Sequence, residues 1–263
     1  MKVTRRDWLK HACLLVPAGA LALFHRLLGA RGSSAEKKYS LEGHNYAFIV
    51  DTTKCIGCGA CVRACKLENK VPDGLFRTWV ERHTITRNSR VTVDSPEGAL
   101  HGFQELESVP VSPARRTSGT SAGGEVAKAF FVSKLCNHCS DPPCVPVCPI
   151  GATYQTPDGV VLTDPNYCFG CAYCIEACPY GVRFKNPNTG TADKCTWCYH
   201  RITKGLLPAC VEACPTGARQ FGDAAAPDSD IAKVLNSHRV DVLRKEMGTR
   251  PKVYYIGLDV EVR

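Results

Sequence analysis

The cysteines of this chain are arranged in four groups of four, and this arrangement limits what the chain can fold around. Sixteen of the 17 cysteines belong to the groups. Two groups have the spacing C-x2-C-x2-C-x3-C, and the other two keep the outer gaps and widen the middle one. The groups are Cys55, Cys58, Cys61 and Cys65; Cys136, Cys139, Cys144 and Cys148; Cys168, Cys171, Cys174 and Cys178; and Cys195, Cys198, Cys210 and Cys214.

This spacing is typical of the loops that bind 4Fe-4S clusters in bacterial ferredoxins. Three thiolates two residues apart can bind three irons of one cluster, while a Cys three residues further on points away and binds a second cluster. Proline follows Cys148, Cys178 and Cys214, where its fixed φ and missing N–H end the turn. The sequence therefore predicts four 4Fe-4S clusters with the sixteen grouped cysteines as ligands, which is the equipment of an electron-transfer protein.

Two other uses of clustered cysteines must be weighed against this prediction. A disulfide framework is common in exported cysteine-rich chains, but cysteines two residues apart are poorly placed to pair with each other. Zinc ribbons bind one ion through four thiolates, but they do not need three cysteines at two-residue steps followed by C-x3-C-Pro. Both patterns fit this sequence less well than iron–sulfur clusters do.

The first 35 residues have the features of an export signal. Residues 4–10 (TRRDWLK) resemble the twin-arginine signal, with Trp8 where Phe is more usual. The apolar stretch 12–24 is too short to cross a bilayer of about 30 Å, and small residues at 33–35 offer a cleavage site. We expect export after cluster binding in the reducing cytoplasm. Cys13 would be lost with the signal, unless the signal is retained as a membrane anchor.

The net charge argues against a nucleic-acid-binding protein once the signal is set aside. The whole chain carries +8, but residues 1–35 hold six basic residues and one acidic residue, which leaves +3 for the remainder. Each oxidised 4Fe-4S centre with its four thiolates adds roughly two negative charges. We therefore expect no nucleic acid among the partners.

The expected fold class is α+β, with short hairpins and helices around the cluster loops and loop-rich insertions. We expect strands at 46–50, 78–86, 130–132 and 253–258, and hairpins at 152–163 and 183–194. Residues 112–124 are rich in Ser, Gly, Thr and Pro, which favours a solvated loop over a docking surface. Residues 230–247 are expected to form a helix with Ser229 as its N-cap. The expected divisions are 1–35, 36–135, 136–190 and 191–263.

Several passages resemble the four-cluster electron-transfer subunits, or B-type subunits, of molybdopterin oxidoreductase complexes, as in dimethyl sulfoxide, tetrathionate and polysulfide reductases. The resemblance covers nearly everything after residue 43. The passages that carry it are CIGCGAC (55–61), LCNHC (135–139) with PPC (142–144), CFGC (168–171) with CPYG (178–181), and KCTWC (194–198) with CVEACP (210–215). The ligand pattern shows no departure from the family, so no three-iron cluster is expected.

The resemblance, and not the spacing, implies how the groups share clusters. Two ferredoxin-like double-cluster units are implied, one nested within the other. The implied ligand sets are Cys55, Cys58, Cys61 and Cys214 for cluster 1; Cys65, Cys195, Cys198 and Cys210 for cluster 2; Cys136, Cys139, Cys144 and Cys178 for cluster 3; and Cys148, Cys168, Cys171 and Cys174 for cluster 4.

The implied function is relay of single electrons between an integral membrane quinone-reactive subunit and a molybdopterin-type catalytic subunit. We expect the chain to be periplasmic or on the outer face of the cytoplasmic membrane, held there through a partner. It has no Gly-rich nucleotide fingerprint, nucleophile elbow or HExxH motif, so we expect no catalysis in this chain. The alternatives are a free-standing periplasmic polyferredoxin and a cysteine-rich zinc-binding interaction protein.

Charged and aromatic residues beside the ligands are expected to have modest roles. Lys54, Lys66, Arg183 and Lys194 could raise cluster potentials, but solvated surface charges are the favoured interpretation. His138 and His200 are expected to be structural hydrogen-bonding residues rather than ligands. Trp197 and Tyr173 are expected to pack around clusters rather than to carry electrons.

Overall fold

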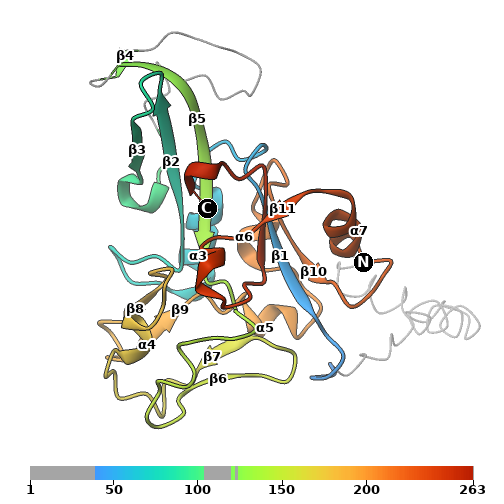
Figure 1. The fold of residues 1–263 in the computed structure, drawn as a ribbon. Helices are drawn as coiled ribbons and strands as arrows, with labels where there is room; N and C mark the ends of the chain where they lie inside the picture. The colour runs from blue at the N-terminus through green and yellow to red at the C-terminus, as the bar shows by residue number, and fades with distance from the viewer. Residues whose placement is uncertain (1–38, 104–119, 122–123, 263) are drawn as a thin grey trace, which may run out of the picture. The chain divides into compact units, whose positions relative to one another are not determined.

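A computed structural model gives the fold (Figure 1), and it describes residues 39–103, 120–121 and 124–262. The chain separates into two units, residues 1–39 and residues 40–263. The expected export signal, with Cys13, lies outside the described residues. All elements of the fold given below belong to the second unit.

One four-stranded sheet joins the beginning and the end of this unit. Its strand order is β10-β1-β12-β11. Strand β1 (Tyr46–Asp51) is central, buried along its whole length, and confirms the strand expected at 46–50. It pairs antiparallel with β10 (Arg219–Asp223) and parallel with β12 (Val253–Ile256). The sheet thus brings segments about 170 and 200 residues apart in sequence into direct contact.

Helix α7 (Asp230–Ser237) covers one face of this sheet. Ile231 packs against Ala47 and Ile49 of β1, so the alternate residue Phe48 faces the opposite side. Ser229 is the N-cap, as expected, because its Oγ accepts a hydrogen bond of 3.1 Å from the Ala232 N–H.

The prediction of a helix over residues 230–247 is wrong in its second half. His238 is extended and ends α7. The chain then forms β11 (Val240–Asp241), which pairs with β12, and a 3-10 turn, η2 (Lys245–Met247). Pairing with a strand more than ten residues away outweighs the local helix preference.

A second sheet has the order β3-β2-β5-β4. Strand β2 (Thr78–Thr86) matches the expected range, whereas β5 (Gly124–Leu135) extends well beyond the expected 130–132. Strand β3 (Val91–Asp94) pairs with β2, the 3-10 turn η1 (Pro96–Ala99) follows, and β4 (Thr120–Ser121) pairs with β5. The expectation of a loop through 124 is wrong at its end, where β4 and β5 form a pair; residues 112–119 lie outside the described residues.

Two small hairpins carry the middle of the chain, as expected. Strands β6 (Thr153–Gln155) and β7 (Val161–Thr163) form one, and β8 (Arg183–Lys185) and β9 (Ala192–Lys194) form the other. The remaining helices are short: α3 (Ala60–Asn69), α4 (Tyr173–Glu176), α5 (Tyr199–Ile202) and α6 (Ala209–Glu212), with η3 (Val260–Val262) at the end. Mixed strands and helices agree with the expected α+β class. The division at 135 and 190 stays a prediction.

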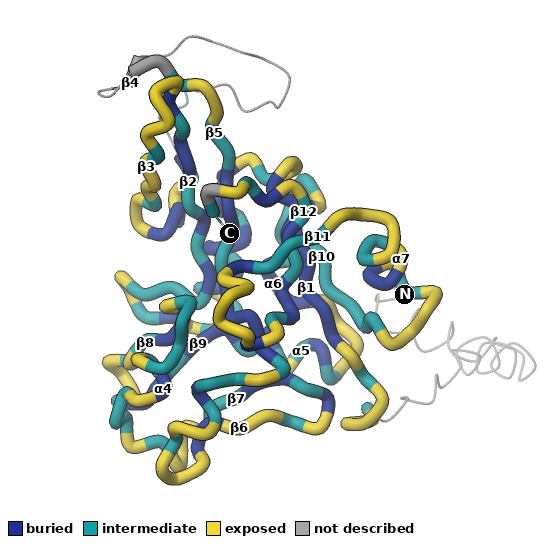
Figure 2. The backbone as a smooth tube through the Cα atoms, in the orientation of Figure 1, coloured by how far each residue is buried: buried dark blue, intermediate teal, exposed yellow. Residues whose placement is uncertain are grey.

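The core follows the central strands and the cysteine loops. Figure 2 shows buried residues along β1 and along the paired strands β2 and β5. Several cysteines are as buried as the aliphatic side chains; Cys65, Cys174, Cys198 and Cys210 are each 5–6% exposed. Within the described residues, no helix is long and apolar enough to cross a membrane.

Candidate iron–sulfur centres

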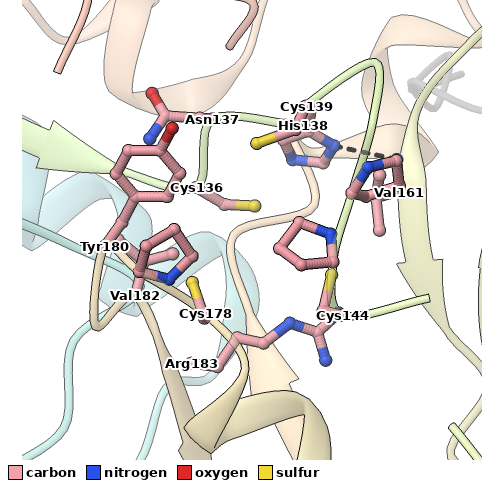
Figure 3. A pocket seen from close by; sticks show the side chains of 13 residues that line it. Cys136, Asn137, His138, Cys139, Cys144, Val161, Cys178, Tyr180, Val182 and Arg183 are labelled. Atoms are coloured by element: carbon pink, nitrogen blue, oxygen red, sulfur yellow. Dashed lines mark hydrogen bonds between the residues drawn. The ribbon is translucent and has the colours of Figure 1, made fainter. Parts of the chain in front are cut away.

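One cavity is lined by three cysteines of the second group and one of the third. Cys136, Cys139, Cys144 and Cys178 surround it, together with Tyr180 and Arg183. Figure 3 shows the four sulfur atoms around a common space, with the Arg183 side chain passing below Cys178 toward Cys144. Burial raises the pKa of Cys139 to about 11, and the other three thiols of the cavity add to the effect. Four thiols held this close need a cation between them to ionise together.

A second cavity joins the first and last groups. It is lined by Cys65, Cys195, Cys198 and Cys210. Burial, followed by the neighbouring Cys195, Cys210 and Cys198 thiols, holds the pKa of Cys65 well above its usual range. Its wall also includes Phe48 of β1, on the face of the sheet away from α7.

A third cavity lies in the hairpin region. Its cysteines are Cys148, Cys168, Cys171 and Cys174. The backbone N–H groups of Thr153 and Ala192 donate to the sulfurs of Cys148 and Cys168, both at 3.4 Å. Although burial works against it, N–H groups of residues 150–153 lower the pKa of Cys148, so the local backbone favours a thiolate there.

Three of the four remaining cysteines, Cys55, Cys61 and Cys214, lie near one another where the first sheet ends. The antiparallel register pairs Val50 of β1 with Arg219 of β10. Cys55 follows β1 and Cys214 precedes β10, so both lie at the same end of this pair. Burial raises the pKa of Cys55 to about 11, and Cys61 and Cys214 contribute to the rise. Cys58 is half-buried on the loop between Cys55 and Cys61.

The structure thus brings together thiols from different groups, and it leaves all sixteen described cysteines free. The disulfide framework weighed above is therefore not seen in the described part of the chain. Among the same residues, no three His, Cys, Asp or Glu side chains are gathered as the ligands of a single metal ion. The thiols instead stand around the walls of the cavities.

Buried hydrogen-bond donors test whether these cavities suit an anionic sulfur-containing group. Within the described residues, several buried polar side-chain atoms have no hydrogen-bond partner, and nearly all of them are N–H groups. Asn137 Nδ2 and Arg183 Nη2 belong to walls of the first cavity, and Arg77 Nε and Trp197 Nε1 to walls of the second. An unpaired buried donor is costly, and the sulfides of a 4Fe-4S cluster are acceptors. The donor set therefore fits such clusters.

Comparison with known proteins agrees with this geometry. Residues 54–152 and 127–224 each match a family described as 4Fe-4S dicluster domain. The chain is 44% identical over 228 residues to the B subunit of tetrathionate reductase from Salmonella typhimurium, which covers 86% of this chain and 78% of the relative. It is 42% identical to the corresponding B subunit from Archaeoglobus fulgidus, covering 86% of this chain and 88% of the relative. It is 38% identical to the thiosulfate reductase electron transfer subunit of Salmonella typhi, covering 68% and 76%.

The chain belongs to the family of reductase iron–sulfur B subunits. Its two dicluster domains imply four 4Fe-4S clusters, as predicted from the cysteine groups. Its role is that of an electron-transfer iron–sulfur subunit of a reductase complex.

Two basic residues of this iron–sulfur subunit are buried, against expectation. Lys194 is 1% exposed, and its Nζ donates to the backbone oxygens of Val161 at 2.5 Å and Cys195 at 2.8 Å. Arg183 is 5% exposed and lies on the wall of the first cavity. The interpretation of these two as surface charges is wrong, because the hairpins fold their strand ends inward onto the cysteine loops.

The other two lysines differ from each other. Lys54 is half exposed and forms a 3.2 Å ion pair with Asp51, as a surface charge does. Lys66 is mostly covered and donates to the carbonyl oxygens of Pro72 at 2.7 Å and Leu75 at 3.2 Å. Lys66 therefore ties the end of α3 to the following loop.

The histidines and aromatic residues behave largely as expected. His138 is fully buried, and both ring nitrogens have backbone partners. His200 is exposed and lies 2.6 Å from a Glu68 oxygen. Trp197 is 1% exposed, as expected for a packed residue, and its ring centroid lies 4.1 Å from that of His138 with the two planes tilted by 30°. Tyr173 is 63% exposed, so the expectation that it packs around a cluster is wrong.

Sequence reasoning missed three polar residues beside the thiols. Asn69 Nδ2 lies 3.6 Å from Cys65 Sγ and 3.7 Å from Cys198 Sγ. Arg77 forms a 2.8 Å ion pair with Asp193 and borders the second cavity. Arg219 is 3% exposed among the thiols of Cys61, Cys210 and Cys55. Only Arg219 had a visible signal, because it follows a Cys-Pro-x-Gly turn as Arg183 does.

Proposed function

We propose that this subunit relays single electrons through four clusters between a membrane quinone-reactive subunit and a catalytic, molybdopterin-type subunit. When bound, each 4Fe-4S cluster accepts and releases one electron. The proposed ligand sets are those given above for clusters 1 to 4. Their support is the gathering of thiols from two groups around each cavity: two cavities join the second and third groups, and one joins the first and last.

Contacts between the sets favour a linear order of clusters, 4–3–2–1. Arg183 lies among thiols of set 4 (Cys174) and set 3 (Cys144). The Cys136 thiol of set 3 is close enough to Cys195 of set 2 to help raise the Cys195 pKa, which burial brings to about 12. Arg219 lies among thiols of sets 2 and 1. Sets 4 and 1 are then the two ends at which electrons enter and leave.

Exposed aromatic residues near set 4 support a partner at that end. Tyr167, Phe169 and Tyr173 are 71%, 63% and 63% exposed and flank Cys168, Cys171 and Cys174. Aromatic side chains are enriched in protein interfaces. In this relay the protein positions the clusters of sets 4 and 1 next to the partner subunits. It also keeps water away from the buried thiols.

The twin-arginine-like residues 4–10 support a location outside the cytoplasm. We place the subunit at the outer face of the cytoplasmic membrane, held there by its partners. Purification distinguishes this complex from the alternative of a free-standing periplasmic polyferredoxin. Extraction from membranes together with a large subunit supports the complex, and recovery alone from a soluble periplasmic fraction contradicts it.

Metal analysis of the purified full chain tests the cluster content directly. The proposal requires about sixteen iron and about sixteen acid-labile sulfide per chain. Zinc in stoichiometric amount without visible absorption would instead support the zinc-binding alternative.

A further inference from the structure

Two turns with the same sequence pattern follow the last cysteines of the third and fourth groups. Residues 178–183 read Cys-Pro-Tyr-Gly-Val-Arg, and residues 214–219 read Cys-Pro-Thr-Gly-Ala-Arg. Gly181 and Gly217 have φ values of 62° and 64°. The N–H of each donates to the carbonyl oxygen of the turn's own cysteine at 3.3 Å. Arg183 and Arg219 therefore hold equivalent positions, each as the first residue of a strand.

The segments after the first two cysteine groups have no such arginine. The second and third groups, which share clusters in the proposed sets, therefore have one, and so do the first and fourth. A third turn, at 148–153, has the same geometry, with Gly151 at φ 68° and a 3.2 Å bond to Cys148, but it ends in Thr153. Thr153 Oγ1 accepts a bond from Arg183 Nη1 at 3.4 Å. After Cys65 the chain continues as helix α3 and forms no such turn.

Both guanidinium groups are buried, and neither has a carboxylate partner in the described part of the chain. They are 5% and 3% exposed, and the hydrogen bonds of Arg219 Nη2 go to the hydroxyls of Thr78 and Ser133. Within the described residues neither arginine forms an ion pair with Asp or Glu. Arg183 Nη2 and Arg219 Nε and Nη1 have no hydrogen-bond partner there. A buried cation in this state needs a nearby negative charge.

The thiols around each arginine belong to two ligand sets. Arg183 lines the cavity of set 3 and also lies beside Cys174 of set 4. Arg219 lies beside Cys61 and Cys55 of set 1 and Cys210 of set 2. An arginine side chain stays protonated in a protein, so each buried guanidinium group carries a positive charge. Each arginine is thus placed between two cluster sites.

We propose that Arg183 and Arg219 are positioning residues, each shared by two clusters, and that each raises the reduction potentials of both clusters beside it. This inference rests on the ligand sets of the proposed function. Reduction adds one negative charge to a cluster, and a fixed buried cation favours the more negative state. One guanidinium between two clusters raises both potentials together, so an electron can pass between them without a large step.

Redox titration of the full chain in its complex, followed by electron paramagnetic resonance, tests this sharing. Arg219→Gln should lower two of the four potentials and leave the other two unchanged, and Arg183→Gln should lower the complementary two. At a fixed ambient potential, the oxidised-to-reduced ratio of each affected cluster should rise about tenfold, or about 59 mV for one electron. Arg219→Lys and Arg183→Lys should keep most of the effect, because the charge remains.

Arg63 provides a matched control. It lies two residues from Cys61 but is exposed, and it donates to the carbonyl oxygens of Cys58 at 3.1 Å and Leu100 at 2.8 Å. Solvent screens its charge, so Arg63→Gln should leave all four potentials unchanged. If Arg63→Gln shifted a reduction potential as much as Arg219→Gln does, burial of the arginine between two cluster sites would not be the cause of the shift.

A shift of one cluster only, of all four, or of none in the glutamine variants would overturn the sharing. If a glutamine variant loses iron, a second experiment on the unsubstituted protein tests the proposal. In this experiment the guanidinium groups of the arginines are labelled with 15N. Hyperfine coupling from that nitrogen to both reduced clusters of a pair, lost in the lysine variant, supports the proposal; coupling to one cluster contradicts it. Iron and sulfide content of the unsubstituted protein reports separately on the four-cluster assignment.

Discussion

The ring of His138 bonds to the backbone beside Cys195: its Nε2 lies 3.0 Å from the Cys195 carbonyl oxygen. On its other side, Nδ1 accepts a bond of 3.0 Å from the Val161 N–H. This pattern fixes the neutral tautomer with the proton on Nε2. Burial, followed by the nearby Lys194 ammonium, holds the His138 pKa well below its usual range, in agreement with a neutral ring. One side chain thereby links loops of ligand sets 2 and 3 through the first hairpin.

His138→Ala should destabilise the protein more than any exposed histidine change. It leaves a cavity beside Trp197 and removes one hydrogen-bond partner each from the Val161 N–H and the Cys195 carbonyl oxygen, which together cost about 2–4 kcal/mol. Calorimetry of the cluster-loaded protein should show a melting temperature lower by several degrees. His200→Ala removes only an exposed ion pair with Glu68 and should change the melting temperature little. Equal effects of the two substitutions would contradict the linking role.

Double substitutions of cysteines should reveal which thiols share a cluster. If Cys136 and Cys178 bind the same cluster, Cys136→Ala combined with Cys178→Ala should lose no more iron than the more damaging single change. Combining Cys178→Ala with Cys168→Ala should remove a second cluster, about four further irons. Iron analysis and the resonance spectrum of the reduced protein measure both. The reverse result would instead support one cluster within each cysteine group.

Gly170→Ala should displace the loop between Cys168 and Cys171. The backbone has φ +75°, and an added Cβ would lie 2.0 Å from the carbonyl oxygen of Gly190. A backbone atom cannot move aside as a flexible side chain can, so the loop that carries Cys168 and Cys171 must shift. We therefore expect loss of one cluster, measured as a loss of about a quarter of the iron. Gly190→Ala is the matched control: its φ is +70°, but no atom lies within 4 Å of the added Cβ. It should cost about 1 kcal/mol of strain and keep the iron.

Glu81 should contribute stability that does not change between pH 8 and pH 5. Burial would raise its pKa, but hydrogen bonds from His83, Lys134 and Trp79 lower it to about 2. A carboxyl whose pKa is lowered on folding stabilises fully above its unfolded value, near 4.5, and loses that stability only as pH falls toward 2. Glu81→Gln should therefore lower stability by about 1–3 kcal/mol, equally at pH 8 and pH 5.

Calorimetry of both proteins at several pH values in this range measures the difference. A difference that shrinks between pH 7 and pH 5 would mean that burial wins over the hydrogen bonds. Asp94, an exposed partner of Arg82, offers a comparison, because Asp94→Asn should cost less than about 1 kcal/mol.

Local features of this protein follow from its sequence alone. The cysteine spacing predicted the cofactor and its number, and strands β1 and β2 were predicted almost to the residue. The two hairpins and the Ser229 cap were predicted as well. These features depend on residues within a few positions of one another, so the local chain geometry suffices to recognise them.

Contacts across long separations depend on the tertiary fold. The pairing of Val50 with Arg219 brings the loop of Cys55 to that of Cys214, which spacing could not reveal. The same packing buries Arg219 and Lys194, and pairing with β12 ends the last helix at Ser237. Strand pairing and the burial of charged side chains depend on interactions with residues far away in the sequence, and a local sequence pattern does not reveal these interactions.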